Sequence, residues 1–141
     1  MYLENRDADF EIIKHDTPIS TVQDAKQYFN IDFAAPVFVV QSEKGIMVLI
    51  TSAKRGKLDF KKISMEIGIS KLKLANREIA EKETGYKIGS MPLIGSKLPC
   101  IFDKSLLNFK YIYGGSGDAL HTLKIKPNDV EHLNNVVFSF N

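Results

Sequence analysis

Apolar and polar residues follow one another in short runs along this chain. Continuous apolar character over residues 36–41 and 46–51, on either side of the turn Ser42–Gly45, predicts a hairpin whose strands are buried on both faces. Residues 71–75 and 121–126 alternate between polar and apolar, which is typical of half-buried strands. Further strands are predicted at residues 98–103, 109–113 and 136–140.

Four helices are predicted from residues that favour helix starts and ends. They begin near Thr21, after Asp59, after Asn76 and at Pro127, and the middle two end at Gly68 and Gly85. Short strands mixed with short helices predict an α+β fold. We expect one compact domain over residues 1–141, built on a curved, mixed, barrel-like sheet with short flanking helices.

The composition narrows the class of protein. With 141 residues, 44% of them hydrophobic and 26% charged, the chain is expected to fold around a real core and not to be disordered. Its single cysteine, Cys100, excludes a disulfide framework and a cysteine-rich zinc site. The first 16 residues lack the apolar segment of a signal peptide, and every apolar run is too short to span a membrane. We therefore expect a soluble, cytoplasmic protein with no membrane partner.

Charge is distributed unevenly along the chain. The net charge is +2, but residues 1–33 carry a net −4, residues 54–87 a net +5 and residues 97–126 a net +3. A solvated surface would explain this pattern, and so would a basic face that binds a polyanion such as RNA. Charge alone does not choose between the two.

The glycine-rich segment Gly114–Gly117 fits neither of two familiar motifs. Leu120 stands where a dinucleotide-binding fingerprint needs glycine, and Asp118 stands where a nucleophile elbow needs it. Two interpretations stay open. The segment is either a hairpin turn that needs positive φ, or a nest of backbone N–H groups for a phosphate or carboxylate.

The histidines and the cysteine give no metal-ligand spacing, so no metal site is expected. His15 and His132 are predicted to lie on the surface. His121, at the start of a strand, either makes structural hydrogen bonds or points into a cleft, where an imidazole can act as acid, base or donor. Cys100 is expected to be a buried, inert thiol.

An ordered set of short motifs resembles one known family over residues 15–135. The set comprises Thr84-Gly85-Tyr86, Gly89-Ser-Met-Pro92-Leu-Ile-Gly95, Leu98-Pro99, Phe102-Asp103, Tyr113-Gly-Gly-Ser-Gly117 and Leu123-Lys-Ile-Lys-Pro127-Asn-Asp129-Val130. Together they resemble the YbaK family, the aminoacyl-tRNA deacylases related to the editing insertion of prolyl-tRNA synthetase.

This resemblance implies hydrolysis of the ester between a wrong amino acid and the 3′ end of tRNA, without a metal or organic cofactor. The implied partners are the tRNA acceptor end or another oligonucleotide, with an aminoacyl-tRNA synthetase as a further candidate. The implied substrate-binding residues are Gly89, Ser90, Met91, Pro92, Gly95, Gly114, Gly115, Ser116 and Gly117. The basic residues expected to contact tRNA phosphates are Lys54, Arg55, Lys57, Lys61 and Lys62.

The chain departs from the family at one important position. Active members carry a lysine at the start of the strand after the first helix, and the matching residue here is Ala35, or Pro36 if the alignment shifts by one. His121 is therefore the candidate catalytic residue of a trans-acting editing hydrolase. The alternative is a non-catalytic module that binds tRNA or an oligonucleotide. In either case residues 89–95 and 114–117 are expected to face each other across one pocket.

Overall fold

The computed structural model describes residues 10–16, 26, 28–87, 91–118 and 120–141. The helix expected near Thr21 lies outside the described residues. The strands are β1 (Phe10–Lys14), β2 (Val37–Ser42), β3 (Gly45–Ile50), β4 (Lys73–Leu74), β5 (Cys100–Asp103), β6 (Ile112–Gly115), β7 (His121–Ile125) and β8 (Val136–Phe140). The α-helices are α2 (Phe60–Ile67), α3 (Arg77–Thr84) and α4 (Pro127–Leu133), and the short 3₁₀ helices are η2 (Ile31–Phe33), η3 (Ala53–Arg55) and η4 (Lys104–Asn108).

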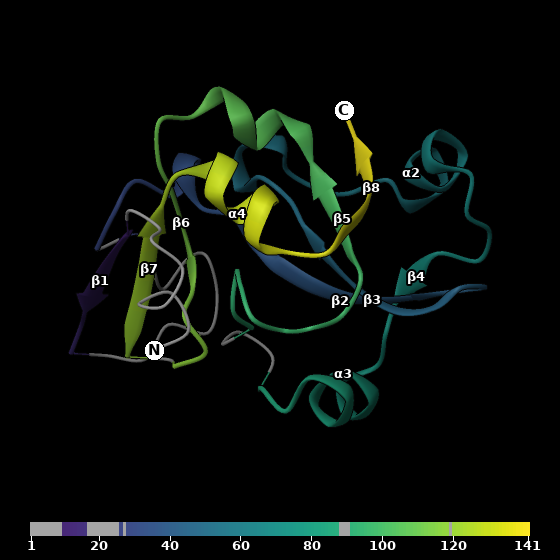
Figure 1. Ribbon diagram of the computed structural model, residues 1–141, viewed down its shortest axis with the longest axis horizontal. Coiled ribbons are helices and arrows are strands. Elements are labelled where there is room, and N and C mark those ends of the chain that lie inside the picture. The colour runs from purple at the N-terminus through teal and green to yellow at the C-terminus, as the bar shows by residue number, and fades with distance from the viewer. Residues whose placement is uncertain (1–9, 17–25, 27, 88–90, 119) are drawn as a thin grey trace.

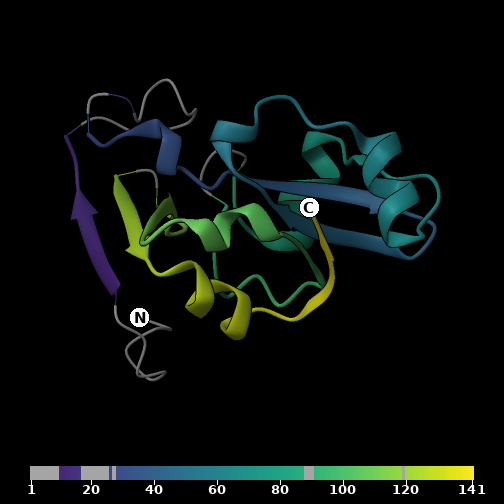
Figure 2. The ribbon, with the colours of Figure 1, turned by 90° about the horizontal axis from the view of Figure 1, so that it is seen from above.

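The strands form two sheets, so the α+β class is confirmed but the sheet is not a closed barrel. Strands β1, β7 and β6 form an antiparallel sheet in that order. The other sheet has the order β4-β2-β3-β5-β8 and is mixed, because β5 runs parallel to both β3 and β8. Figures 1 and 2 show the three-stranded sheet at one end of the molecule and α2 at the other.

A single bridge between Ala34 and Tyr113 joins the two sheets. Beyond it, the N–H of Leu93 donates to the carbonyl of Gly115 over 2.9 Å. This hydrogen bond places the loop that carries Leu93 beside β6, next to the bridge.

The predicted helix caps of α2 and α3 are confirmed. Asp59 accepts a hydrogen bond from the N–H of Lys62, and Gly68 ends α2 in the left-handed conformation. Asn76 caps α3 in the same way, and Gly85 ends it. Pro127 is the first residue of α4, as predicted.

The five-stranded sheet is buried on both faces, which explains its continuous apolar runs. Along β3, Val48 and Ile50 belong to one core cluster, whereas Met47 and Leu49 belong to another on the opposite face. Residues of α3, α4, β6 and β7 complete the first cluster, and Ile63 of α2 joins the second. None of the helices in the described part of the chain has the length and apolar character that a membrane span requires.

Several predicted boundaries were wrong. Strand β1 was not predicted, because its partner β7 lies more than 100 residues further along the chain. The strand predicted at 109–113 begins only at Ile112, because η4 occupies residues 104–108. The segment predicted at 71–75 is paired only at Lys73 and Leu74. Gly114 and Gly115 belong to β6 and not to the turn.

Candidate functional site

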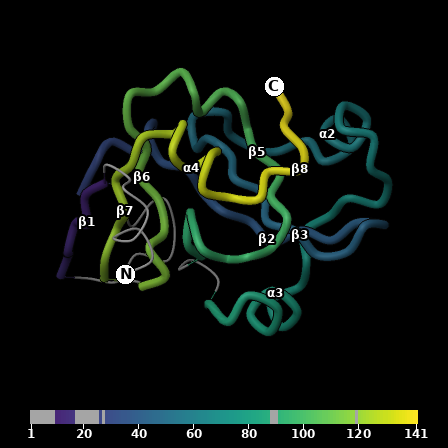
Figure 3. The backbone as a smooth tube through the Cα atoms, viewed as in Figure 1, coloured from purple at the N-terminus to yellow at the C-terminus, as the bar shows by residue number. Residues whose placement is uncertain are grey.

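The two glycine segments lie directly against each other over their described parts, so they are neighbours as expected, and the pocket expected between them stays a prediction. The loop from α3 to β5 passes beside β6, where Leu93 donates its N–H to Gly115 (Figure 3). A Cβ at Gly115 would overlap the carbonyl oxygen of Met91, and one at Gly114 would lie 2.5 Å from the side chain of Leu93. These glycines are therefore required by the close approach of the loop, not by positive φ. Of the predicted substrate-binding residues, Gly89 and Ser90 lie outside the described residues.

The loop that contains Met91 and Pro92 is held by packing and by hydrogen bonds. Met91, Pro92 and Leu93 are buried, and Gly95 adopts a φ of +94°. The side-chain amide of Asn134, at the end of α4, donates to the carbonyl of Leu93 over 2.7 Å. Sequence reasoning missed Asn134, since the local signal marks only a helix end. The Asn134 amide also donates to the carbonyl of Val130, four residues earlier, and this is the local hydrogen bond that a helix end suggests.

Ala35 lies next to the glycine segments but offers only a buried methyl group. Its N–H donates to the carbonyl of Tyr113 over 2.7 Å, so Ala35 and Leu93 are bonded to nearby carbonyls of β6. Ala35 is 1% exposed and belongs to the same core cluster as Met91 and Leu93. Ala35, one of the two residues matched from the sequence to the family's lysine, is therefore part of the core.

His121 is held by a carboxylate from the turn before it. Its Nδ1 lies 3.1 Å from Oδ2 of Asp118, and the His121 side chain is 34% exposed. The other Asp118 oxygen accepts the N–H of Leu120, and this hydrogen bond is the main cause that lowers the pKa of Asp118. The hydroxyl of Ser116 donates to the carbonyl of His121 over 2.8 Å. Sequence reasoning did not identify Asp118 as the partner of His121.

Strand register places the His121 side chain on the same face of the sheet as Gly114. Gly114 pairs with Leu123, and His121 lies two residues before Leu123, so both side chains of β7 point to that face. Lys14 pairs directly with His121 across β1 and β7. Because His15 donates its N–H to Leu120 in the next pair, Lys14 and His121 form the closer, non-hydrogen-bonded type of pair. Lys14, His121 and Gly114 therefore lie on the same face of this sheet, where the side chain of Leu93 covers Gly114.

The predicted tRNA-contacting residues differ in what their side chains do. Lys54, Lys57, Lys61 and Lys62 are exposed around η3 and the first turn of α2. The Arg55 guanidinium instead forms a bidentate salt bridge with buried Asp103, with Nε 2.7 Å from Oδ2 and Nη2 2.8 Å from Oδ1. Burial alone would raise the pKa of Asp103, but the hydrogen bonds from Arg55 and its neighbours outweigh it and lower this pKa. Among the described residues, Arg55 therefore forms a salt bridge with a buried carboxylate, and the four lysines form none.

Three further predictions concern isolated polar groups. Cys100 is fully buried, which confirms that part of the prediction, and burial raises the pKa of its thiol to about 12, as expected for a thiol that is not activated. The prediction that His15 lies on the surface was wrong, because β1 pairs with β7 and places its ring 3.2 Å from the Thr122 hydroxyl. His132 is exposed, as predicted. Within the described residues, no group of three acidic, histidine or cysteine side chains could hold a metal ion.

Comparison with known proteins gives one family and several similar folds. A family model for the aminoacyl-tRNA editing domain matches residues 16–133. A candidate trans-editing enzyme for prolyl tRNA synthetase has a TM-score of 0.84 at 23% identity, over 99% of this chain and 90% of that one. The hypothetical protein APE2540 has a TM-score of 0.83 at 20% identity, over 98% and 94% of the two chains. A candidate signal transduction protein from Marinobacter aquaeolei VT8 has a TM-score of 0.63 at 13% identity, over 94% of this chain and 27% of that one.

Proposed function

Because the chain belongs to the aminoacyl-tRNA editing domain family, we propose that it hydrolyses the ester bond of mischarged aminoacyl-tRNA as a separate, trans-acting protein. The observation that carries this proposal is the His121–Asp118 pair on the face of the sheet that also presents Gly114. It supplies a proton acceptor close to the segment that matches the family, although the family's lysine is missing at Ala35.

In the proposed reaction His121 acts as a general base. Asp118 holds Nδ1 and so leaves Nε2 to accept a proton from a water molecule. The water oxygen attacks the ester carbonyl, and backbone N–H groups of residues 116–117 stabilise the oxyanion. The ester C–O bond then breaks, the ribose oxygen takes the proton from His121, and the amino acid leaves as a free acid. Lys14, opposite His121, provides the positive charge that Ala35 cannot provide.

The substrate would be recognised at two levels. The 91–95 and 114–117 segments bind the aminoacyl group, and the buried apolar side chains of Met91, Leu93 and Ile94 limit the size of the side chain that is accepted. The exposed lysines at 54, 57, 61 and 62 contact phosphates of the acceptor stem. An aminoacyl-tRNA synthetase is a further candidate partner, because editing in trans must compete with release of the charged tRNA.

A second function, binding without turnover, is favoured by the surroundings of Ala35. Its methyl group is buried among core residues, so no ammonium group can occupy the family's position without repacking. A chain that keeps the fold and the basic surface but lacks this group could still hold the acceptor end of a tRNA.

The experiment that separates the two functions is a deacylation assay. The protein, in excess, is mixed with a panel of tRNAs that each carry a small non-cognate amino acid. Editing predicts that at least one ester is lost well above its spontaneous rate, while a tRNA carrying the same amino acid through an amide bond is bound and not cleaved. Binding of every panel member without accelerated hydrolysis of any would identify the non-catalytic module.

A further inference from the structure

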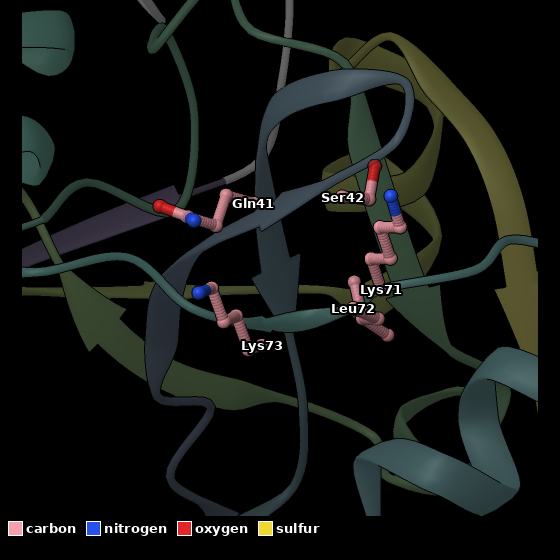
Figure 4. Close-up of a pocket in the computed structure, with 5 residues that line it drawn as sticks. All are labelled: Gln41, Ser42, Lys71, Leu72 and Lys73. Atoms are coloured by element: carbon pink, nitrogen blue, oxygen red, sulfur yellow. The ribbon is translucent and has the colours of Figure 1, made fainter.

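We propose that a lysine-lined depression at the open end of strands β2 and β4 is a separate binding site for a backbone phosphate of RNA. Its volume is about 340 Å³, and it is lined by Gln41, Ser42, Lys71, Leu72 and Lys73 (Figure 4). RNA as the ligand rests on the proposed function, but the site itself does not depend on hydrolysis.

The side chains of the depression form two pairs. Gln41 and Lys73 are directly opposite each other in the ladder between β2 and β4, so they share one face. Figure 4 shows them together on one side, with Ser42 and Lys71 on the other, and the ammonium end of Lys71 points the same way as the Ser42 hydroxyl. Gln41 and Lys73 therefore lie on one side of the β2–β4 ladder, and Ser42 and Lys71 lie on the other. Lys73 beside the Gln41 amide can neutralise a phosphate and donate hydrogen bonds to it. The Ser42 hydroxyl already donates to the carbonyl of Gly45, so on the other side Lys71 contributes its charge alone.

The backbone around the depression is fixed before any ligand binds. The N–H of Glu43 donates to the carbonyl of Ser70 over 3.2 Å, and the N–H of Ser70 donates to the Glu43 carboxylate over 3.0 Å. This reciprocal pair ties the β2–β3 turn to the loop before β4. The hydrogen bond from the Ser70 N–H is also the main reason why the pKa of Glu43 is lowered, so this carboxylate stays ionised and bonded to Ser70. Lys44 and Lys71 lie close enough to Glu43 to act on it electrostatically, and with Lys73 they leave the rim net positive.

Lys71 adopts a backbone conformation that lysine disfavours. Its φ is +61°, in the left-handed region where glycine or asparagine is normally found. A glycine would fit this backbone without strain, so a side-chain function is the reason we infer for lysine at this position. Strained non-glycine residues gather at binding sites, where the surrounding structure holds them in place. Here the reciprocal bonds between Glu43 and Ser70 hold the neighbouring residue.

The position of the depression suits an elongated ligand. Ala35 lies beside the glycine segments and Ser42 lines the depression, and the extended chain between them spans about 23 Å at roughly 3.3 Å per residue. A small anion could bind either at the glycine segments or in the depression, but could not reach both. A nucleic acid with its acylated end at the glycine segments could reach the depression with a phosphate further along its backbone.

The test uses a deacylated RNA minihelix of an acceptor stem, so that binding is measured without any hydrolysis. Anisotropy titrations at several salt concentrations compare the wild type with the double variant Lys71→Gly/Lys73→Ala. We expect affinity to fall about tenfold and the slope of log affinity against log salt to become shallower by about 1–2. The double arginine variant should stay within about twofold of the wild type, since it keeps both charges.

Two comparisons make the result specific. Lys104→Ala removes one exposed charge after β5, at the other end of the sheet, and should lower affinity much less. The single variant Lys71→Gly should melt no lower than the wild type, because it removes backbone strain, yet bind RNA more weakly. Equal effects of the double variant and Lys104→Ala would overturn the site, and so would a wild type that binds no RNA. A wild type that binds through these lysines but hydrolyses no ester would retain the site and reject the proposed catalysis.

Discussion

At the scale of single residues, the most consequential contacts join positions that are far apart in sequence. Gly115 meets Met91, Arg55 binds Asp103, and His15 reaches Thr122. The residue types were visible in the sequence, and the positive φ expected of the glycine turn is found at Gly117, whose φ is +96°. The close approach at Gly114 and Gly115 was not foreseen, since a clash with a distant side chain or carbonyl cannot be inferred from a turn. Burial of His15 was missed for the same reason.

Substitutions at the two strand glycines should have different costs. At Gly115 an added methyl group meets the backbone oxygen of Met91, which cannot move without displacing the loop. At Gly114 it meets the side chain of Leu93, which is buried and must shift, but no backbone atom has to move first. We expect Gly115→Ala to lower the free energy of unfolding by about 2–4 kcal/mol and Gly114→Ala by about 1–2 kcal/mol. Urea unfolding measures both, and the reverse order would contradict the packing described here.

Stability should depend on pH through Asp103. Hydrogen bonds from Arg55, Ser105 and Thr51 outweigh burial and lower its pKa in the folded state. A carboxyl with a lowered pKa stabilises the fold above its unfolded pKa, near about 3.9, and loses that contribution as pH falls through the folded value. Asp103→Asn should therefore cost about 2–4 kcal/mol at neutral pH, and less below about pH 4. A cost that is constant from neutral pH down to about pH 2 would show that the ionised carboxylate is not what matters.

At the scale of elements, local signals were reliable and long-range pairing was not. The caps of α2 and α3 were predicted correctly because Asp59 and Asn76 act within one turn of their own helices. The β2–β3 hairpin was predicted from its apolar runs and its turn. Strand β1 was missed because its partner, β7, lies more than 100 residues away. The two-sheet arrangement was also missed, since it depends on pairing between strands far apart in the sequence, such as β1 with β7 and β3 with β5.

The contact between α4 and this loop provides a test at the element scale. Asn134→Ala removes the amide that donates to the carbonyls of Leu93 and Val130. We expect a loss of about 1–2 kcal/mol in unfolding free energy and faster hydrogen exchange in the 91–95 loop. The neighbouring Asn135→Ala is the control, because its side chain is exposed. If the 91–95 loop exchanged its amide hydrogens at the same rate in Asn134→Ala and in Asn135→Ala, Asn134 would not be what holds the loop.

At the scale of the whole molecule, an editing-domain fold combines a glycine-lined face with two groups of lysines. The family could be predicted from the order of its motifs, and the family model confirms it over residues 16–133. The sequence could also show that Ala35 lacks the family's ammonium group. It could not show that Lys14 and His121 become neighbours, or that Asp118 holds the imidazole, because both depend on how β1, β7 and the turn come together. This arrangement is the basis of the proposed catalysis.

The measurement that tests the proposed catalysis most directly is single-turnover deacylation by the wild type, His121→Ala and His132→Ala. The mischarged tRNA used is the one that the wild type hydrolyses fastest, and circular dichroism checks that each variant is folded. Loss of a general base should slow His121→Ala by about 10²-fold or more. His132→Ala, altered at an exposed histidine of α4, should match the wild type. A folded His121→Ala protein that hydrolyses the ester at the wild-type rate would contradict the account.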